Sequence, residues 1–186
     1  MNLTEISIKN KTDKEWAHKY ISNFYEEKFA QYKDSCINIV EIGVQNGFSI
    51  KTWREYFTNA NLIGIDVDDK GFEEMKGVKY ILGDAYDKNT VEKIPDSMII
   101  IDDGPHSYTS QVRFILHYLP KLQLNGLLII EDIQSPNCFV WQDYLDVFDE
   151  LVNYLSKYLN REYEIEKKVT EKTHSDSLIY CVKRIK

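Results

Sequence analysis

The stretch Met98-Ile-Ile-Ile-Asp-Asp-Gly-Pro-His-Ser107 decides how the rest of the chain is interpreted. A short apolar run that ends in polar and turn-forming residues is typical of a strand buried on both faces of a parallel sheet. Asp102 and Asp103 then stand where this strand leaves the sheet, and open α/β sheets bind ligands beside the carboxyl ends of their strands. The stretch therefore predicts an α/β fold whose ligand site includes these acids and His106.

A second apolar run, Leu127-Leu-Ile-Ile-Glu-Asp132, also ends in two acids. The interval between Asp103 and Glu131 is long enough for one helix and one return strand, and a right-handed crossover would make the two strands parallel. Both acidic pairs would then meet at one edge of the sheet. Several carboxylates beside an imidazole indicate a site for a hard cation with a base next to it.

The composition is that of one globular domain spanning residues 1–186, with 43% hydrophobic and 28% charged residues. The net charge of −7, without clustered Lys and Arg, argues against a nucleic-acid or anionic-membrane partner. We find no apolar run of membrane-spanning length and no signal peptide. Cys36, Cys138 and Cys181 form no paired motif, so we expect reduced thiols in a cytoplasmic protein. The sequence leaves the subunit count open, a homo-oligomer included.

Strand-like and helix-like segments alternate along the chain. Aromatic residues at helical spacing predict one amphipathic helix over residues 12–33, which packs on the core or, alternatively, acts as a lid. Asn125-Gly126 predicts the turn that leads into the fifth strand. We expect a Rossmann-like, doubly wound, mostly parallel seven-stranded sheet that ends in an antiparallel hairpin. Besides the two runs above, its predicted strands are 37–43, 61–66, 78–83, 162–169 and 177–183, and its later helices begin near 49, 87, 107 and 141.

A glycine loop, Gly43-Val-Gln-Asn-Gly47, follows the first strand and precedes a helix. Such a loop allows the backbone to approach a ligand closely. The spacing differs from the three-glycine dinucleotide fingerprint, which disfavours a nicotinamide oxidoreductase. Asp66 ends the second strand, where an acid can accept hydrogen bonds from a ribose; a merely solvated acid is the alternative.

Three motifs resemble the class I S-adenosylmethionine-dependent methyltransferases: Glu41-x-Gly43-x-x-x-Gly47, Gly64-Ile-Asp66 and Gly83-Asp84-Ala85. The resemblance implies that the glycine loop approaches the methionine part of the cofactor. It also implies that Asp66 binds the ribose and that Asp84 and Ala85 flank the adenine. We include Glu41 and Asp102 in the same predicted cofactor site.

Further motifs look like the metal-dependent sugar O-methyltransferases of macrolide tailoring: Thr12-Asp-Lys14, His18-x-Tyr20, Ile101-Asp-Asp-Gly-Pro-His106 and Ile130-Glu-Asp132. The resemblance implies that Asp103, Glu131 and Asp132 hold Mg²⁺ or another divalent cation and that His106 is the base. Pro105 departs from the family, in which serine is usual at this position. We therefore expect Mg²⁺-dependent methylation of a hydroxyl on a sugar or glycosylated small molecule, with Asp103 and His106 as catalytic residues.

Two other functions fit parts of the pattern. A catechol-type O-methyltransferase also uses carboxylates around magnesium. A non-catalytic binding module with this fold would keep the glycine loop but would have no use for clustered acids. The simplest alternative leaves the acids as solvated loop residues, and two acidic pairs with a histidine beside one of them argue against it.

Overall fold

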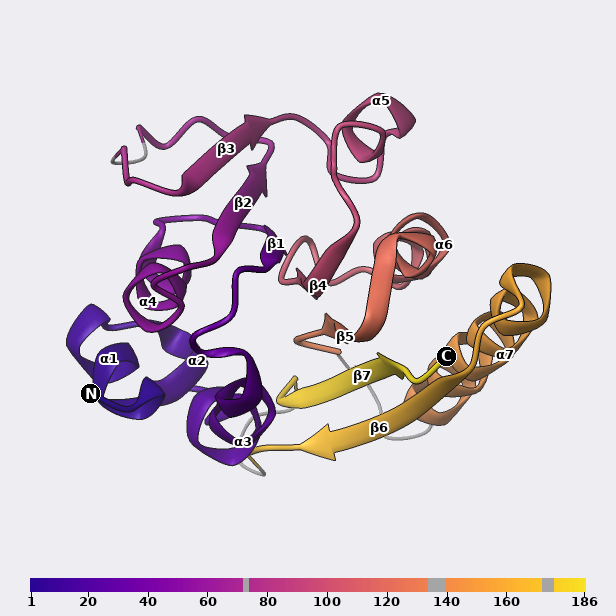
Figure 1. Ribbon diagram of the computed structural model, residues 1–186. Helices are drawn as coiled ribbons and strands as arrows, with labels where there is room; N and C mark the ends of the chain where they lie inside the picture. The colour runs from indigo at the N-terminus through magenta and orange to yellow at the C-terminus, as the bar shows by residue number, and fades with distance from the viewer. Residues whose placement is uncertain (72–73, 134–139, 172–175) are drawn as a thin grey trace.

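A seven-stranded sheet with the order β3-β2-β1-β4-β5-β7-β6 forms the centre of the molecule (Figure 1). The computed structural model describes residues 1–71, 74–133, 140–171 and 176–186. The first five strands pair in parallel, and β7 runs antiparallel to both β5 and β6. The predicted fold class is thereby confirmed. The strands are β1 (Asn38–Ile42), β2 (Asn61–Asp66), β3 (Val78–Leu82), β4 (Ser97–Asp102), β5 (Leu122–Ile130), β6 (Tyr163–Val169) and β7 (Leu178–Arg184).

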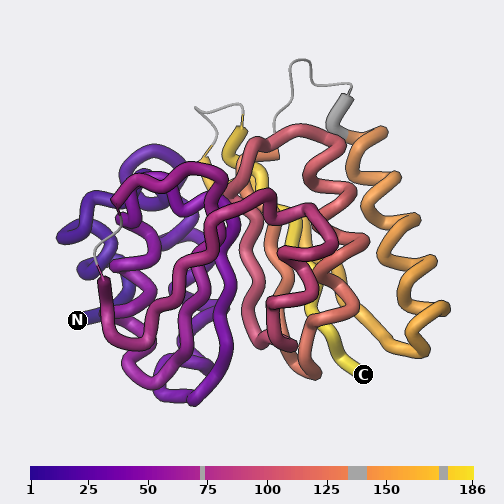
Figure 2. The backbone as a smooth tube through the Cα atoms, turned by 90° about the horizontal axis from the view of Figure 1, so that it is seen from above, coloured from indigo at the N-terminus to yellow at the C-terminus, as the bar shows by residue number. Residues whose placement is uncertain are grey.

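Helices cover both faces of the sheet. The N-terminal helices and α4 lie on one face, and α5, α6 and α7 lie on the other (Figure 1, Figure 2). The α-helices are α1 (Leu3–Asn10), α2 (Asp13–Trp16), α3 (Glu26–Phe29), α4 (Phe48–Tyr56), α5 (Lys88–Val91), α6 (Tyr108–Tyr118) and α7 (Val140–Leu159). A π-helical turn (Ile21–Tyr25) and two 3₁₀ segments (Ala30–Tyr32 and Leu119–Lys121) complete the helical structure.

Strand β4 is buried on both faces, as its apolar run predicted. Ile99 and Ile101 pack into the hydrophobic cluster under the N-terminal helices, whereas Ile100 packs into the cluster under α6 and α7. Successive residues of a strand point to opposite faces of the sheet. All three side chains are fully buried because a hydrophobic cluster covers each face. The parallel pairing of β4 with β5 brings Asp102 opposite Ile130, so the acids that follow both strands lie at the same edge.

The single helix predicted over residues 12–33 is wrong. The segment is broken into α2, the π-helical turn, α3 and a 3₁₀ turn. Lys19 has φ 57°, a left-handed conformation that ends a right-handed helix. The aromatic spacing is nevertheless informative for Tyr20, Phe24 and Phe29, which are buried, whereas Trp16 is 69% exposed.

The turn predicted at Asn125-Gly126 is also wrong, because β5 begins earlier, at Leu122, and runs through it. The pairing with β4 shifts register at this point. Asn125 has φ 65°, and a Cβ at Gly126 would lie 2.7 Å from the carbonyl oxygen of Met98. The turn-forming residues therefore produce an irregularity inside the strand instead of ending it.

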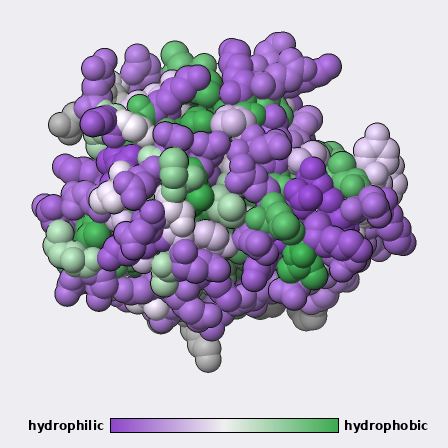
Figure 3. Space-filling view, viewed as in Figure 1, coloured by the Kyte–Doolittle hydropathy of each residue, from purple (hydrophilic) through white to green (hydrophobic). Residues whose placement is uncertain are grey.

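Hydrophilic side chains dominate the face shown in Figure 3, and the hydrophobic areas between them are small. Among the described helices, none combines the length and the apolar character that crossing a bilayer requires. Cys181 is buried and Cys36 is exposed, both as free thiols, whereas Cys138 lies outside the described residues.

Candidate active site

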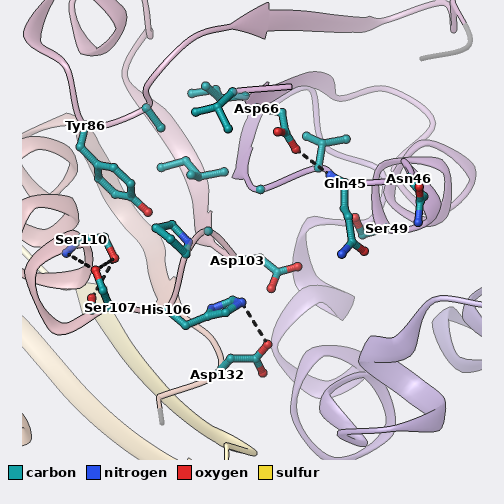
Figure 4. Close-up of a pocket in the computed structure, with 18 of the residues that line it drawn as sticks. Gln45, Asn46, Ser49, Asp66, Tyr86, Asp103, His106, Ser107, Ser110 and Asp132 are labelled. Atoms are coloured by element: carbon teal, nitrogen blue, oxygen red, sulfur yellow. Dashed lines mark hydrogen bonds and ion pairs between the residues drawn. The ribbon is translucent and has the colours of Figure 1, made fainter. Parts of the chain in front are cut away.

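A cavity of about 770 Å³ opens at the carboxyl ends of the parallel strands. Its wall is formed by loops that follow different strands, as expected for ligand sites in open α/β sheets. The N-terminal segment closes one side through Thr12, Asp13 and Trp16. Among the lining residues are Gly43, Gln45, Asp66, Asp84, Ala85, Tyr86, Asp103, His106 and Asp132, several of which are labelled in Figure 4.

The glycine loop packs directly against the end of β4. Gly43 has φ 82°, and a Cβ built on it would lie 1.9 Å from the backbone oxygen of Asp103. The backbone nitrogen of Asp103 in turn donates to the carbonyl of Ile42 at 2.9 Å. Only glycine permits both this conformation and this approach, so the loop and the acid are fixed relative to each other.

Asp66 organises the same loop from the end of β2. Its Oδ2 accepts a hydrogen bond from the backbone nitrogen of Gln45 at 2.8 Å, and its Oδ1 accepts one from Asp68 at 3.0 Å. Figure 4 shows the carboxylate directed at the Gln45 backbone on the cavity wall. The acid therefore supports the glycine loop and remains at the cavity surface.

Asp103, His106 and Asp132 form a cluster that is suited to a metal ion. Each residue offers one possible ligand atom, and these three atoms all lie within 4.8 Å of one another. His106 Nε2 is 3.6 Å from Asp132 Oδ2, and Figure 4 shows the imidazole directed at this carboxylate. The two carboxylates supply the oxygen donors that a divalent cation such as Mg²⁺ prefers, and the imidazole beside them can act as a further donor or as a base.

The backbone is unusual at two members of this cluster. His106 has φ 54° and Asp132 has φ 49°, which is uncommon for residues other than glycine. Ser107, next to His106, caps α6 by accepting a hydrogen bond from the backbone nitrogen of Ser110 at 3.1 Å. Left-handed residues of this kind are concentrated at functional sites. Here they bring an imidazole and a carboxylate together from two different loops.

Glu131 is fully buried beside this cluster and has partners from the N-terminal segment. Its Oε2 contacts the Nζ of Lys14, and its Oε1 accepts a hydrogen bond from the hydroxyl of Tyr25. The Nζ of Lys14 also lies 2.6 Å from Asp103 Oδ2 and 3.4 Å from Glu41 Oε1. Asp103 and Glu131 therefore share one ammonium group, so the two strands do bring their acids to one place.

Asp132 also has partners from the N-terminal segment. The hydroxyl of Tyr20 donates to its Oδ1, and Nδ1 of His18 lies 3.7 Å from the same oxygen. The rings of His18 and Tyr20 are stacked, with centroids 5.0 Å apart. The segment thus packs on the core and contacts the acids at the same time, while its role as a lid stays a prediction.

Burial changes the acidity of these groups. Burial, opposed by the Lys14 ammonium, raises the pKa of Asp103 above its usual value and raises that of Glu131 further. The same effect raises the pKa of Glu41 to about 7. For Lys14, burial lowers the pKa, but the surrounding carboxylates outweigh it and the pKa is raised well above its ordinary value. The lysine is therefore a permanent positive charge at this site.

Asp102 is buried behind the cavity and is separate from the cluster. Its Oδ1 accepts a hydrogen bond from the hydroxyl of Tyr86 at 2.6 Å. Burial raises the pKa of Asp102 to about 7, although the bond from Tyr86 opposes the change. Burial therefore favours the protonated carboxyl group far more at Asp102 than at an exposed aspartate.

The structure brings most of the predicted cofactor residues to one cavity. Gly43, Asp66, Asp84 and Ala85 line it. Of the described residues, Glu41, Gly47 and Asp102 do not line it: Glu41 accepts hydrogen bonds from Ser49 and Trp53, and Gly47 caps α4. The roles of all seven in cofactor binding stay predictions.

Sequence reasoning assigned no role to Lys14, Tyr20 or Tyr25, which contact the acids directly. Lys14 and Tyr20 do occur in two of the motifs that carry the family resemblance. Nothing in the chain order indicates that these side chains reach acids more than one hundred residues away.

No protein-family model matches the chain. It is 28% identical over 159 residues to the 8-demethyl-8-alpha-L-rhamnosyl tetracenomycin-C 2'-O-methyltransferase of Streptomyces olivaceus, covering 80% of this chain and 41% of that protein. It is 26% identical over 144 residues to the demethylmacrocin O-methyltransferase of Streptomyces fradiae, covering 71% of this chain and 36% of that protein. The chain thus spans about two fifths of the length of these relatives.

Solved structures with the same fold include the MycE methyltransferase from the mycinamycin biosynthetic pathway, in complex with Mg, SAH and mycinamycin VI. That match has a TM-score of 0.80 and 21% identity, and it covers 99% of this chain and 54% of the other. The structure "cmcI-D160 Mg-SAM" matches with a TM-score of 0.53 and 21% identity, covering 80% of this chain and 65% of the other. The chain therefore has the fold of the class I S-adenosylmethionine-dependent methyltransferases, and the relatives found by sequence are named as O-methyltransferases.

Proposed function

We propose that this chain transfers a methyl group from S-adenosylmethionine to a hydroxyl group on the sugar of a glycosylated small molecule, with a divalent cation such as Mg²⁺. One observation carries the proposal: the Asp103–His106–Asp132 cluster faces the same cavity as Gly43 and Asp66. A site for a cation and a site for a methyl donor are thus next to each other. The relatives are named for rhamnosyl tetracenomycin-C and demethylmacrocin as substrates, and these names support the substrate class.

The methyl donor would lie along the glycine loop. Gly43 and Gln45 line the cavity beside it, and the Asp66 carboxylate is available to the ribose hydroxyls. Asp84 and Ala85 border the cavity beyond β3, where the adenine would lie. Both carboxylate oxygens of Asp66 already accept backbone hydrogen bonds, which hold them rigidly. They can therefore bind a ribose at little cost in conformational entropy.

Asp103, Asp132 and Glu131 would hold the divalent cation. The first two have ligand atoms in the cluster described above. Each oxygen of Glu131 accepts one hydrogen bond and keeps a further lone pair, so the bonds from Lys14 and Tyr25 leave it able to bind a cation. When bound, the cation acts as a Lewis acid on the acceptor hydroxyl and lowers its pKa.

His106 would serve as the general base. It takes the proton of the acceptor hydroxyl at a ring nitrogen, while Asp132, 3.6 Å from Nε2, stabilises the resulting imidazolium. The acceptor oxygen forms a bond to the methyl carbon, the carbon–sulfur bond of the sulfonium breaks, and the sulfur keeps the electron pair. Alignment of the two substrates in one cavity supplies much of the rate acceleration.

The net charge of −7 and the cavity of about 770 Å³ point to a small acceptor and not to nucleic acid or a membrane as partner. We also propose a cytoplasmic location, where S-adenosylmethionine is made and free thiols stay reduced. Self-association into a homo-oligomer stays part of the proposal.

The proposal is tested by radiolabelled methyl transfer from S-adenosylmethionine to a panel of rhamnosides, macrolide glycosides and catechols, with Mg²⁺ or EDTA. We expect label on glycosides only, and only with the metal. Label on catechols alone would favour a catechol-type enzyme. Binding of S-adenosylhomocysteine without turnover on any acceptor would favour a binding module, and label that persists in EDTA would contradict a metal-dependent reaction.

A further inference from the structure

The ammonium of Lys14 is buried at the point where three neighbouring strands end. The side chain is 2% exposed and its Nζ contacts Glu41 of β1, Asp103 after β4 and Glu131 after β5. A lysine buried to this degree is rare unless it is paired, and here it is paired three times. The residue comes from α2, outside the sheet, so the contacts also tie the N-terminal segment to the strand ends.

The same carboxylates belong to the proposed metal site. Asp103 contributes one oxygen to the Asp103–His106–Asp132 cluster, and its Oδ2 lies 2.6 Å from Lys14. Glu131 contacts Lys14 and directly precedes Asp132. An ammonium and a divalent cation that share two acids within a few ångströms repel each other, and a buried site screens this repulsion poorly.

We propose that Lys14 is a positioning residue that acts against the divalent cation: it holds Asp103 and Glu131 in place without metal and weakens metal binding to the same acids. The inference rests on the proposed function and deepens it, since it states what sets the metal affinity. Without the ammonium, buried carboxylates would repel one another and the site would not be preformed. With it, the site is preformed but binds the cation more weakly and releases it more readily.

The effect is reciprocal, as linkage requires. If Lys14 weakens metal binding, a bound metal must weaken the contacts between Lys14 and the acids by the same factor. The inference therefore predicts two independent results, one from a substitution and one from the unchanged protein. A lysine that does not interact with the bound cation would produce neither.

The first experiment measures Mn²⁺ binding to the metal-free protein by electron paramagnetic resonance, with all variants at the same pH. Lys14→Met keeps the length of the side chain and removes its charge. We expect it to bind Mn²⁺ at least about tenfold more tightly than the unchanged protein. Lys11→Met is the matched control, because Lys11 is exposed, lines the same cavity and lies three residues away; it should change the affinity less than about twofold.

Equal or weaker Mn²⁺ binding by Lys14→Met would overturn the inference and leave the proposed function standing. Absence of Mn²⁺ binding by the unchanged protein would overturn the proposed function itself, and the inference with it. The two failures are therefore distinguishable in one series of titrations.

The second experiment needs no substitution and covers the case in which Lys14→Met does not fold. In protein labelled with ¹⁵N-lysine, a buried ammonium exchanges its protons slowly and gives a resolved NMR signal. Titration with Mg²⁺ should shift this signal and speed its proton exchange. Both changes should have the same midpoint Mg²⁺ concentration as metal binding. An unchanged signal at saturating Mg²⁺ would overturn the inference.

Discussion

The Nε2 atom of His106 lies 3.6 Å from the Oδ2 atom of Asp132, across the gap between the loops that follow β4 and β5. This proximity depends on the parallel pairing of the two strands, which aligns Asp102 with Ile130. It also depends on the left-handed backbone at both residues. An imidazole and a carboxylate are thus held side by side at the edge of the cavity, as the proposed role of His106 as general base needs.

Replacement of His106 by glutamine should lower the rate of methyl transfer by about 10²- to 10⁴-fold, the usual contribution of a general base. Binding of S-adenosylhomocysteine, measured by calorimetry, should stay within about twofold of the unchanged protein. His117→Gln is the matched control, because His117 lies on α6 outside the cavity lining. Full activity of His106→Gln would show that another group removes the proton.

Replacement of Asp66 by asparagine should weaken binding of S-adenosylhomocysteine by about tenfold or more. Hydrogen bonds to a charged group are each worth about 1.5–3 kcal/mol, and 1.4 kcal/mol corresponds to a factor of ten. The control is Asp69→Asn, since Asp69 is exposed in the following loop. If both variants bind the ligand as the unchanged protein does, Asp66 is a solvated acid and not a ribose ligand.

Replacement of Gly43 by alanine should cost far more stability than replacement of Gly71, although both glycines have a positive φ. The left-handed conformation alone costs a non-glycine residue about 1–2 kcal/mol. A Cβ at Gly71 would meet nothing within 4 Å, whereas one at Gly43 would lie 1.9 Å from the backbone of Asp103. Urea denaturation of the two variants measures the difference, and equal losses would contradict the close packing of the loop against β4.

Asp102 should make the metal-free protein less stable as the pH rises. Its pKa is raised to about 7 in the folded state by burial, above the ordinary value of 3.8. The folded state therefore binds more protons than the unfolded state between these two values, and the free energy of unfolding falls as the pH rises through this range. Asp102→Asn keeps an acceptor for the Tyr86 hydroxyl and removes the titration.

We therefore expect the melting temperature of Asp102→Asn to fall less between pH 5 and pH 8 than that of the unchanged protein. Asp84→Asn, at the cavity surface, is the control and should leave the slope unchanged. A steeper or identical slope for Asp102→Asn would mean that Asp102 is not the group that titrates.

The part of the site that lies on the sheet was predictable from the sequence. A buried strand with an apolar run must end in its first polar residues, so Asp103, Glu131 and Asp132 are placed by the runs before them. Parallel pairing of consecutive strands then brings them together, as the pairing of β4 with β5 confirms. Local pattern and chain order contain all of this information.

The contribution of the N-terminal segment was not predictable in the same way. Periodicity places Tyr20 on the aromatic face of a helix and Tyr25 beside that face, but it does not show that their hydroxyls reach Asp132 and Glu131. The left-handed residue Lys19 divides the segment, and this break decides where the side chains point. Such contacts depend on tertiary packing, and the spacing of residues along a helix contains no information about it.

The most direct test of the account is Mn²⁺ binding to the metal-free protein, followed by electron paramagnetic resonance, with Asp103→Asn and Asp132→Asn. Mutation of a residue that hydrogen-bonds to a metal ligand changes metal affinity by about 10- to 100-fold. Loss of a ligand itself should therefore weaken Mn²⁺ binding by about 100-fold or more. The exposed Asp68→Asn is the control. The account predicts one bound ion per chain in the unchanged protein and in the control, and none at the same Mn²⁺ concentration in the two cluster variants. Equal binding by all four proteins would contradict it.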